Sequence, residues 1–173
     1  IIASIFGSGP DDFRLLTEKL DTLNFAGYEL NLSCPHVAGV GTEIGHFPEL
    51  VYDVIKEVRK ATKKVVIAKL SPNTEKLVDV AKAAEKAGAD ALCAINTVRA
   101  CSIDIYSQKA SLSNSIGGLS GPAIKPIAVR CVFELYQNTS LPIIGCGGIS
   151  QWQDVIEFFL AGATLVQVGT AAA

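Results

Sequence analysis

The chain has 173 residues, of which 49% are hydrophobic, and its formal net charge is −2. These values predict one soluble globular domain, residues 1–173, that buries a sizeable core. Lysines and arginines are scattered along the chain rather than clustered, so the charge pattern does not favour binding to nucleic acid. No apolar run approaches the roughly 20 residues that cross a bilayer, and no signal-like segment opens the chain. We therefore expect a cytoplasmic protein that does not insert into membranes.

Five cysteines form an odd set without a Cys-x-x-Cys spacing, which argues against a disulfide framework and against a zinc site. Cys93 lies in an apolar stretch and Cys131 has apolar neighbours on an expected helix, so both are predicted to be small core residues. Cys34 differs in position because it follows an expected strand and precedes Pro35. A thiol on a polar loop tip is the one that the pattern favours for chemistry.

Strand and helix patterns alternate along the whole chain. Strands are expected at 1–6, 27–32, 64–70, 89–96, 142–145 and 164–168. Helices are expected at 11–23, 47–61, 74–87, 123–137 and 152–161, the third of them capped by Asn73 or Thr74. Residues 98–120 are rich in Ser, Asn and Gly and carry no clear periodicity, which predicts a long functional or mobile loop.

Short apolar runs such as residues 65–67 suit strands that are buried on both faces, so the sheet is expected to be parallel. A closed barrel of eight strand-helix units typically needs about 250 residues. With six strands and five connecting helices, the chain is expected to form an α/β fold of the (β/α)8 barrel type, present as a partial barrel. Such a chain on its own is expected to be unstable and to self-associate, because two sheet edges lack partners.

Polar or glycine residues follow five of the expected strands, where the carboxyl ends of parallel strands gather. The five stretches are Asn-Leu-Ser-Cys-Pro-His at 31–36, Lys-Leu-Ser-Pro-Asn at 69–73, Ile-Asn-Thr at 95–97, Gly-Cys-Gly-Gly-Ile at 145–149 and Val-Gly-Thr at 168–170. A further run, Gly-Gly-Leu-Ser-Gly-Pro-Ala-Ile-Lys-Pro, covers residues 117–126. Asparagine amides at strand ends can bind a ligand, and they also serve as plain turn residues.

In their order, these motifs resemble the dihydroorotate dehydrogenase family, flavin enzymes of pyrimidine biosynthesis on a (β/α)8 barrel. The resemblance covers essentially the whole chain and aligns it with barrel strands three to eight, so the first two strands, with an additional lysine, are expected to be absent. It implies oxidation of dihydroorotate to orotate, with FMN as the hydride acceptor and Cys34 as the general base. A cysteine at this position is typical of the class 1 enzymes.

The resemblance also assigns the remaining site residues. Asn31, Asn96 and Thr97 would bind the pyrimidine, and Asn31 and Lys69 would contact the flavin, where the lysine charge would stabilise its reduced form. Glycines bring backbone N–H groups close to a phosphate, and barrel enzymes commonly bind one after their last two strands. The other residues expected to hold FMN are Ile95, Gly121, Gly147, Gly148, Gly169 and Thr170.

Two positions depart from the family pattern. His36 stands where the most familiar motif has an asparagine that helps to bind the pyrimidine, and Ala3 stands where many class 1 enzymes have an asparagine that contacts the flavin. The flavin domain of dihydropyrimidine dehydrogenase, which reduces uracil and thymine, can carry Ser-Cys-Pro-His, so it is one alternative. A non-catalytic partial barrel is the other.

The run at 117–126 most resembles the subtype that passes electrons to NAD. For this subtype the resemblance implies a separate partner subunit that carries FAD and an iron-sulfur cluster, and a homodimeric core in the intact protein. No metal site is expected within this chain.

Overall fold

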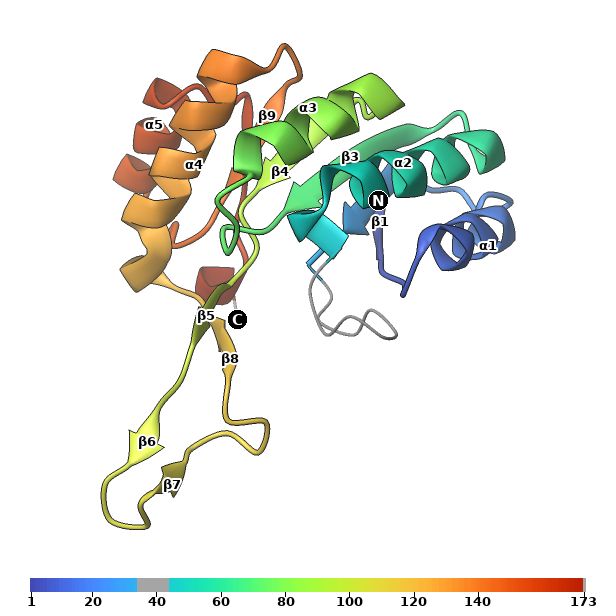
Figure 1. Cartoon of the computed structure of the whole chain (residues 1–173). Coiled ribbons are helices and arrows are strands. Elements are labelled where there is room, and N and C mark those ends of the chain that lie inside the picture. Colours follow the sequence, from blue (N-terminus) through green and yellow to red (C-terminus); the bar gives the residue numbers. More distant parts are fainter. Residues whose placement is uncertain (34–43, 173) are drawn as a thin grey trace.

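The computed structural model describes residues 1–33 and 44–172. Six strands form one parallel sheet in the order β1-β2-β3-β4-β9-β10, which curves as a partial barrel (Figure 1). Their bounds are β1 Ile2–Ile5, β2 Gly27–Asn31, β3 Val65–Leu70, β4 Ala91–Ala94, β9 Ile143–Cys146 and β10 Leu165–Gln167. The expected fold class is confirmed, with all six strands in the predicted places.

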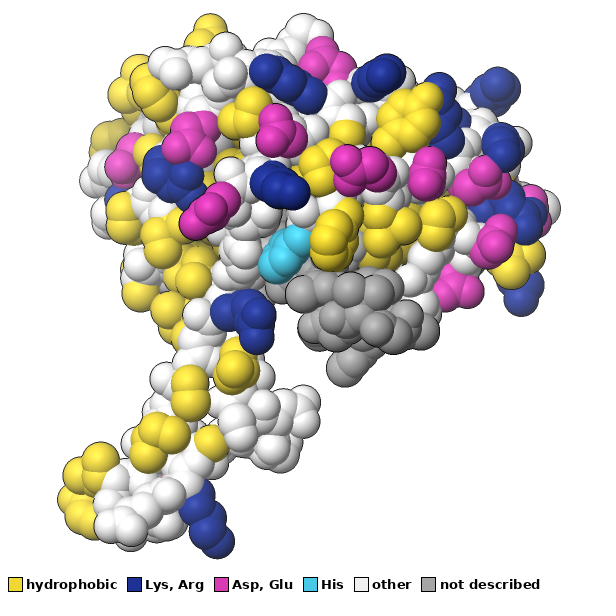
Figure 2. Space-filling view, viewed as in Figure 1, with side chains coloured by type: hydrophobic (Ala, Val, Ile, Leu, Met, Phe, Trp, Pro, Cys, Tyr) yellow, Lys and Arg dark blue, Asp and Glu magenta, His cyan; other side chains and the backbone are white. Residues whose placement is uncertain are grey.

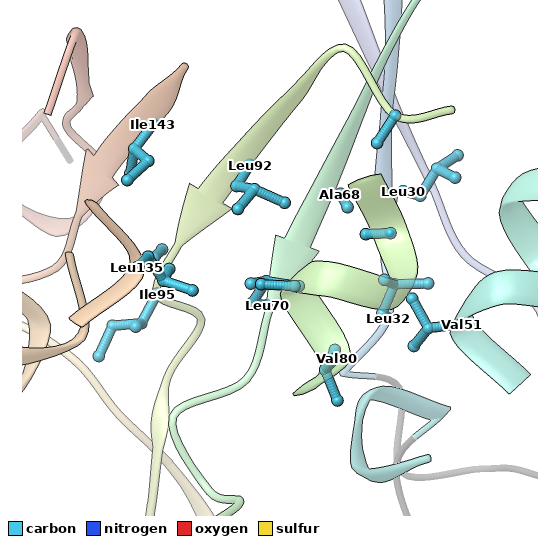
Figure 3. Packing of buried hydrophobic residues seen from close by; sticks show 14 of the residues in the cluster. Leu30, Leu32, Val51, Ala68, Leu70, Val80, Leu92, Ile95, Leu135 and Ile143 are labelled. Carbon is cyan, nitrogen blue, oxygen red and sulfur yellow. The ribbon is translucent and has the colours of Figure 1, made fainter. Parts of the chain in front are cut away.

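Five helices cover one face of this sheet: α1 Pro10–Leu20, α2 Pro48–Ala61, α3 Leu77–Ala87, α4 Lys125–Asn138 and α5 Trp152–Leu160. On α2, Val51, Val54, Ile55 and Val58 recur at helical spacing and are fully buried. They belong to one large core between helices and strands, in which Leu30, Ala68 and Leu92 of three adjacent strands face the helix layer (Figure 3). Burial of this apolar layer is what holds the helices onto the sheet. The short 3-10 helices are η1 Ile44–His46, η2 Pro122–Ile124 and η3 Thr170–Ala172.

The opposite face of the sheet, the barrel interior, carries a second and smaller set of side chains. Because successive residues of a strand point to opposite faces, Glu29, Lys69 and Cys93 lie on the interior side while their sequence neighbours face the helices. Apolar interior contacts come from Ile67, Ala91, Cys93, Ile144 and Cys146. Alternation along the strands thus separates an apolar outer core from an interior that also holds charged groups.

Residues 98–119 form an arm that projects from the sheet rather than a loop without regular structure (Figures 1 and 2). Two short antiparallel pairs build it, β5 Val98–Ala100 with β8 Gly117–Leu119 and β6 Ile103–Asp104 with β7 Lys109–Ala110. The prediction of a loop was wrong here, because such short strands depend on pairing across the arm and leave no periodic signal. At its tip, Ile105 and Tyr106 are 76% and 93% exposed.

The third helix also differs from the prediction, since α3 begins at Leu77 rather than at position 74. The Thr74 hydroxyl accepts a hydrogen bond from the Lys76 amide in a local turn, and the expected cap Asn73 serves the arm instead. Asn73 Nδ2 donates to the Thr97 carbonyl at 3.1 Å, and Asn73 Oδ1 accepts from the Arg99 amide at 3.0 Å. The loop after β3 therefore fixes the base of the arm.

Cys93 and Cys131 are both buried, as predicted. Cys34 and His36 lie in the range 34–43, outside the described residues. Within the described ranges, no helix combines the length and apolar character needed to cross a membrane. In the same ranges, no cluster of three His, Cys, Asp or Glu side chains is arranged to hold a metal ion.

Candidate active site

A cavity of about 390 Å³ opens at the carboxyl ends of β3, β4, β9 and β10. Nine of the residues predicted from the strand-end motifs line it: Lys69, Ile95, Asn96, Thr97, Gly121, Gly147, Gly148, Gly169 and Thr170. They come from segments up to about a hundred positions apart in sequence, and the parallel sheet brings them to one edge. Asn31 lies beside this group and contacts one of its members.

Glycine is required on the wall of the cavity that follows β9. Gly148 has a φ of +78°, and a Cβ there would lie 2.8 Å from the Gly121 carbonyl oxygen and from the Lys125 amide nitrogen. The turn therefore packs against the start of α4 as only glycine allows. At Gly169 a Cβ would meet no atom within 4 Å, so the absent side chain leaves open space in the cavity.

The same wall is fixed by an ionic cluster below it. The Asp154 carboxylate accepts hydrogen bonds from the Ser150 and Gln151 amides and from Lys125 Nζ, the last at 2.7 Å. Chiefly because of the Lys125 ammonium, the pKa of Asp154 lies well below its ordinary value. Across the cavity mouth, Thr170 Oγ1 donates to Ser120 Oγ at 2.9 Å and joins the segment after β10 to the segment after the arm.

Lys69 lies at the cavity floor, with only 17% of its side chain exposed. Its Nζ donates to Gln167 Oε1 at 2.8 Å and lies 3.4 Å from Glu29 Oε1. Burial acts to lower the pKa of Lys69, but at the high pH where an ammonium titrates the negative charges of Cys93, Glu29 and Cys146 together raise it above its ordinary value. Lys69 is therefore a cation at neutral pH, held inside the barrel rather than extended into solvent.

Two thiols lie beside this ammonium. A hydrogen bond from Cys93, with the Lys69 charge, lowers the pKa of Cys146, and the same contact together with burial raises the pKa of Cys93. Near neutral pH the Cys93 thiol is accordingly uncharged, which leaves Glu29 as the main counter-charge of Lys69. Cys146 also lines the cavity.

The predicted pyrimidine-binding amides meet directly. Asn96 Nδ2 donates to Asn31 Oδ1 at 2.9 Å, and the same oxygen accepts from the Ser33 amide at 3.2 Å. Asn96 Oδ1 accepts from the Thr97 amide at 2.8 Å. This chain of hydrogen bonds orients the amides at the ends of β2 and β4. Ser33 is the last described residue before Cys34, so the predicted base follows directly in sequence.

Sequence reasoning missed Glu29, Gln167 and Cys146 as parts of the site. A signal existed for the first, since Glu29 is two residues before Asn31 and therefore shares its face of β2. Gln167 likewise stands at an interior position of β10, in register with Cys146 of β9. A charged or amide side chain inside an otherwise apolar strand is the feature that identifies Glu29 and Gln167.

Comparison with known proteins adds independent evidence. The profile of the dihydroorotate dehydrogenase family matches residues 1–173. The chain is 56% identical over 171 residues to the catalytic subunit of dihydroorotate dehydrogenase B (NAD+) of Pyrococcus furiosus, and 54% identical to that of Thermococcus kodakarensis. These alignments cover 99% of this chain and 57% and 56% of the relatives, so the chain spans a little over half their length.

A solved structure agrees at the level of the fold. The crystal structure of the Eimeria tenella dihydroorotate dehydrogenase in complex with ferulenol superposes with a TM-score of 0.74 at 23% identity. That match covers 94% of this chain and 48% of the other. The family profile, which spans the whole chain, shows the assignment and the identity to the relatives agrees with it: the chain belongs to the dihydroorotate dehydrogenase family.

Proposed function

We propose that this protein oxidises dihydroorotate to orotate in de novo pyrimidine biosynthesis, with FMN as its cofactor. The observation that carries the proposal is the convergence of Lys69, Asn96 and the glycine-rich segment around Gly148 on one cavity at the carboxyl ends of the strands. This is the place where barrel enzymes build their active sites. The NAD-linked type of the relatives in the two archaea supports the assignment.

The lining of the cavity supports FMN as the cofactor. Gly147, Gly148, Gly169 and Thr170 would supply backbone groups and a hydroxyl for the phosphate, and the space that a Cβ of residue 169 would occupy is open. Lys69, with Ile95, Gly121 and Asn31, would hold the ring. When bound, FMN supplies the acceptor for a hydride, which no protein side chain can provide.

The substrate would be oriented by the Asn31, Asn96 and Thr97 groups, which can both donate to and accept from the carbonyl and N–H groups of a dihydropyrimidine. Cys34 would remove the proton from the carbon next to the one that loses hydride. The Lys69 ammonium would favour the negative charge that reduction places on the ring.

Electron transfer onward would need a partner. The archaeal relatives are named as catalytic subunits, which supports a separate electron-transfer subunit with FAD and an iron-sulfur cluster that passes electrons to NAD. A homodimeric core is the assembly we propose for the catalytic subunit.

The proposal is tested with the full-length gene product. An absorbance scan of the purified protein should show bound flavin, which anaerobic mixing with dihydroorotate should bleach. Absence of flavin after reconstitution with FMN would contradict the proposal and favour a non-catalytic barrel.

One sequence feature favours a second candidate, a uracil- or thymine-reducing enzyme. His36 completes a Ser-Cys-Pro-His motif of the kind that the flavin domain of dihydropyrimidine dehydrogenase can carry. Dihydrouracil in place of dihydroorotate distinguishes the two. If dihydrouracil bleaches the flavin and dihydroorotate does not, the substrate is a dihydropyrimidine of the uracil type rather than dihydroorotate.

A further inference from the structure

A network of four side chains crosses the barrel interior beneath the cavity. We name Ser4, Glu29, Lys69 and Gln167 the interior network. Glu29 accepts hydrogen bonds from Ser4 Oγ at 3.1 Å and from Gln167 Nε2 at 3.0 Å, and lies 3.4 Å from Lys69 Nζ. Its side chain is only 6% exposed. A buried carboxylate with three partners is a defined structural element rather than a solvated charge.

The polarity of the network is fixed by its two charged ends. An ammonium can only donate hydrogen bonds and a carboxylate can only accept them. Gln167 lies between the two, so its Oε1 must face Lys69 and its Nε2 must face Glu29, as the distances of 2.8 and 3.0 Å show. Gln167 thereby sets the direction in which the Lys69 ammonium points.

Only two of the four residues of the interior network line the cavity. Lys69 and Gln167 line the cavity, and Glu29 and Ser4 are not among its lining residues. Glu29 can therefore influence a ligand only through space and through Lys69. The carboxylate offsets the charge of the ammonium at short range in a poorly solvated interior, where such effects are large.

We propose that Glu29 is a positioning residue which sets the strength of the positive field that Lys69 presents at the cavity floor, with Gln167 as the bridge between them. For the flavin this inference rests on the proposed function. Within the cavity the inference can be tested without a ligand. The Cys146 thiol lies in the same electric field, so its reactivity reports that field. Among the described residues, the groups facing Cys146 are Lys69, Glu29 and Cys93 from β3, β2 and β4, and Gln167 from β10.

The first test uses flavin-free full-length protein and the substitution Glu29→Gln, which keeps the shape and removes the charge. The rate of Cys146 alkylation by iodoacetamide is followed against pH, with peptide mass spectrometry separating Cys146 from the other thiols. Removal of a nearby negative charge favours the thiolate, so the midpoint should fall by on the order of half a pH unit. Glu29→Asp, which keeps the charge, should retain the wild-type profile.

Glu57→Gln is the matched control, because Glu57 lies on α2 at the outer face and pairs with Lys60 there. It removes one carboxylate from the protein without touching the interior. An unchanged Cys146 profile in Glu29→Gln, with native circular dichroism, would overturn the inference. So would an equal shift in Glu57→Gln, since it would reflect net charge alone.

The second test measures the midpoint potential of the bound flavin. Glu29→Gln should raise it, because reduction adds negative charge to the ring and the variant leaves Lys69 uncompensated. We expect a change of roughly tenfold in the ratio of oxidised to reduced flavin, which is about 30 mV for a two-electron couple. Wild-type potential in Glu29→Gln would overturn the inference even if Cys146 responds, because the field would not reach the ligand. If the wild-type protein binds no flavin, the proposed function is overturned instead, and the Cys146 result is unaffected.

Discussion

Asn31 Oδ1 accepts a hydrogen bond from Asn96 Nδ2 at 2.9 Å, which joins the ends of β2 and β4 across the intervening strand β3. Lys69, on β3, is in register with both Asn31 and Cys93. The two amides therefore flank the strand that carries the buried cation. Each amide loses an orienting partner when the other is removed.

For this reason Asn96→Ala should weaken binding of dihydroorotate more than it affects the flavin. We expect the KM to rise roughly tenfold or more, the scale for loss of oriented hydrogen bonds to a polar substrate, with flavin content unchanged. Asn138→Ala, at the exposed end of α4, is the control and should behave as wild type. Equal KM values for Asn96→Ala and wild type would remove Asn96 from substrate binding.

Cys34→Ser tests the predicted base. A serine hydroxyl is far less acidic than a thiol, so reduction of the flavin by dihydroorotate should slow by roughly 100-fold near neutral pH while flavin stays bound. Stopped-flow absorbance measures this step. Cys101→Ser provides a matched thiol loss on the exposed arm, and reduction at wild-type speed in Cys34→Ser would contradict the assignment.

Lys69→Ala should reduce both flavin affinity and the rate of flavin reduction. The substitution removes the cation at the cavity floor and leaves the Glu29 carboxylate buried without its counter-charge. Equilibrium dialysis of FMN and redox titration measure the two effects, and Lys63→Ala serves as a surface control. Unchanged flavin content together with an unchanged potential would show that Lys69 has no cofactor role.

At the opposite end of the strands, Asp21→Asn should destabilise the fold. Asp21 Oδ1 accepts hydrogen bonds from Thr62 Oγ1 at 2.6 Å and from Tyr28 OH at 3.1 Å. With the side chain 31% exposed, we expect a loss of about 1 kcal/mol in the free energy of unfolding at pH 7. Urea titrations of wild type and variant measure it.

The pH dependence follows from the pKa of Asp21, which is lowered mainly by the hydrogen bond from Thr62 and further by Tyr28 and Lys64. Because the folded pKa lies below the unfolded one, the carboxylate contributes its stability above the unfolded pKa and loses it as the pH falls through the folded pKa. The difference between wild type and Asp21→Asn should therefore shrink below about pH 4. A constant difference down to pH 2 would contradict this account.

Residues 1–173 expressed alone should self-associate and turn over no dihydroorotate. β1 and β10 are the two edges of the six-stranded sheet, and apolar residues there are open to water, with Ile2 and Leu165 44% and 60% exposed. Unpaired apolar edges promote association between chains. Analytical ultracentrifugation measures the self-association of these residues. A monodisperse, active monomer would contradict the prediction.

Hydrophobic patterning predicted all six sheet strands, because short apolar runs that suit strands buried on both faces are written locally into each segment. The strand-end motifs predicted that Lys69, Asn96 and Gly148 lie at one edge of the sheet, and the structure brings them to one cavity, since parallel strands bring their carboxyl ends together. The start of α3 could not be predicted, because the competing role of Asn73 depends on an arm that folds back from distant sequence. The hydrogen bond between Glu29 and Gln167 could not be predicted for the same reason, because its partners are distant in sequence.

That hydrogen bond links positions 138 residues apart, and β2 and β10 are not adjacent in the sheet. Its two partners can meet only when the intervening strands have paired and the sheet has acquired its curvature. Contacts of such long sequence separation form late, after their loop-closure cost has been met by other interactions. We therefore expect the orientation of the Lys69 ammonium to be established late as the chain folds. An early intermediate with a well-ordered β1–β4 segment would still lack the charge arrangement of the cavity floor.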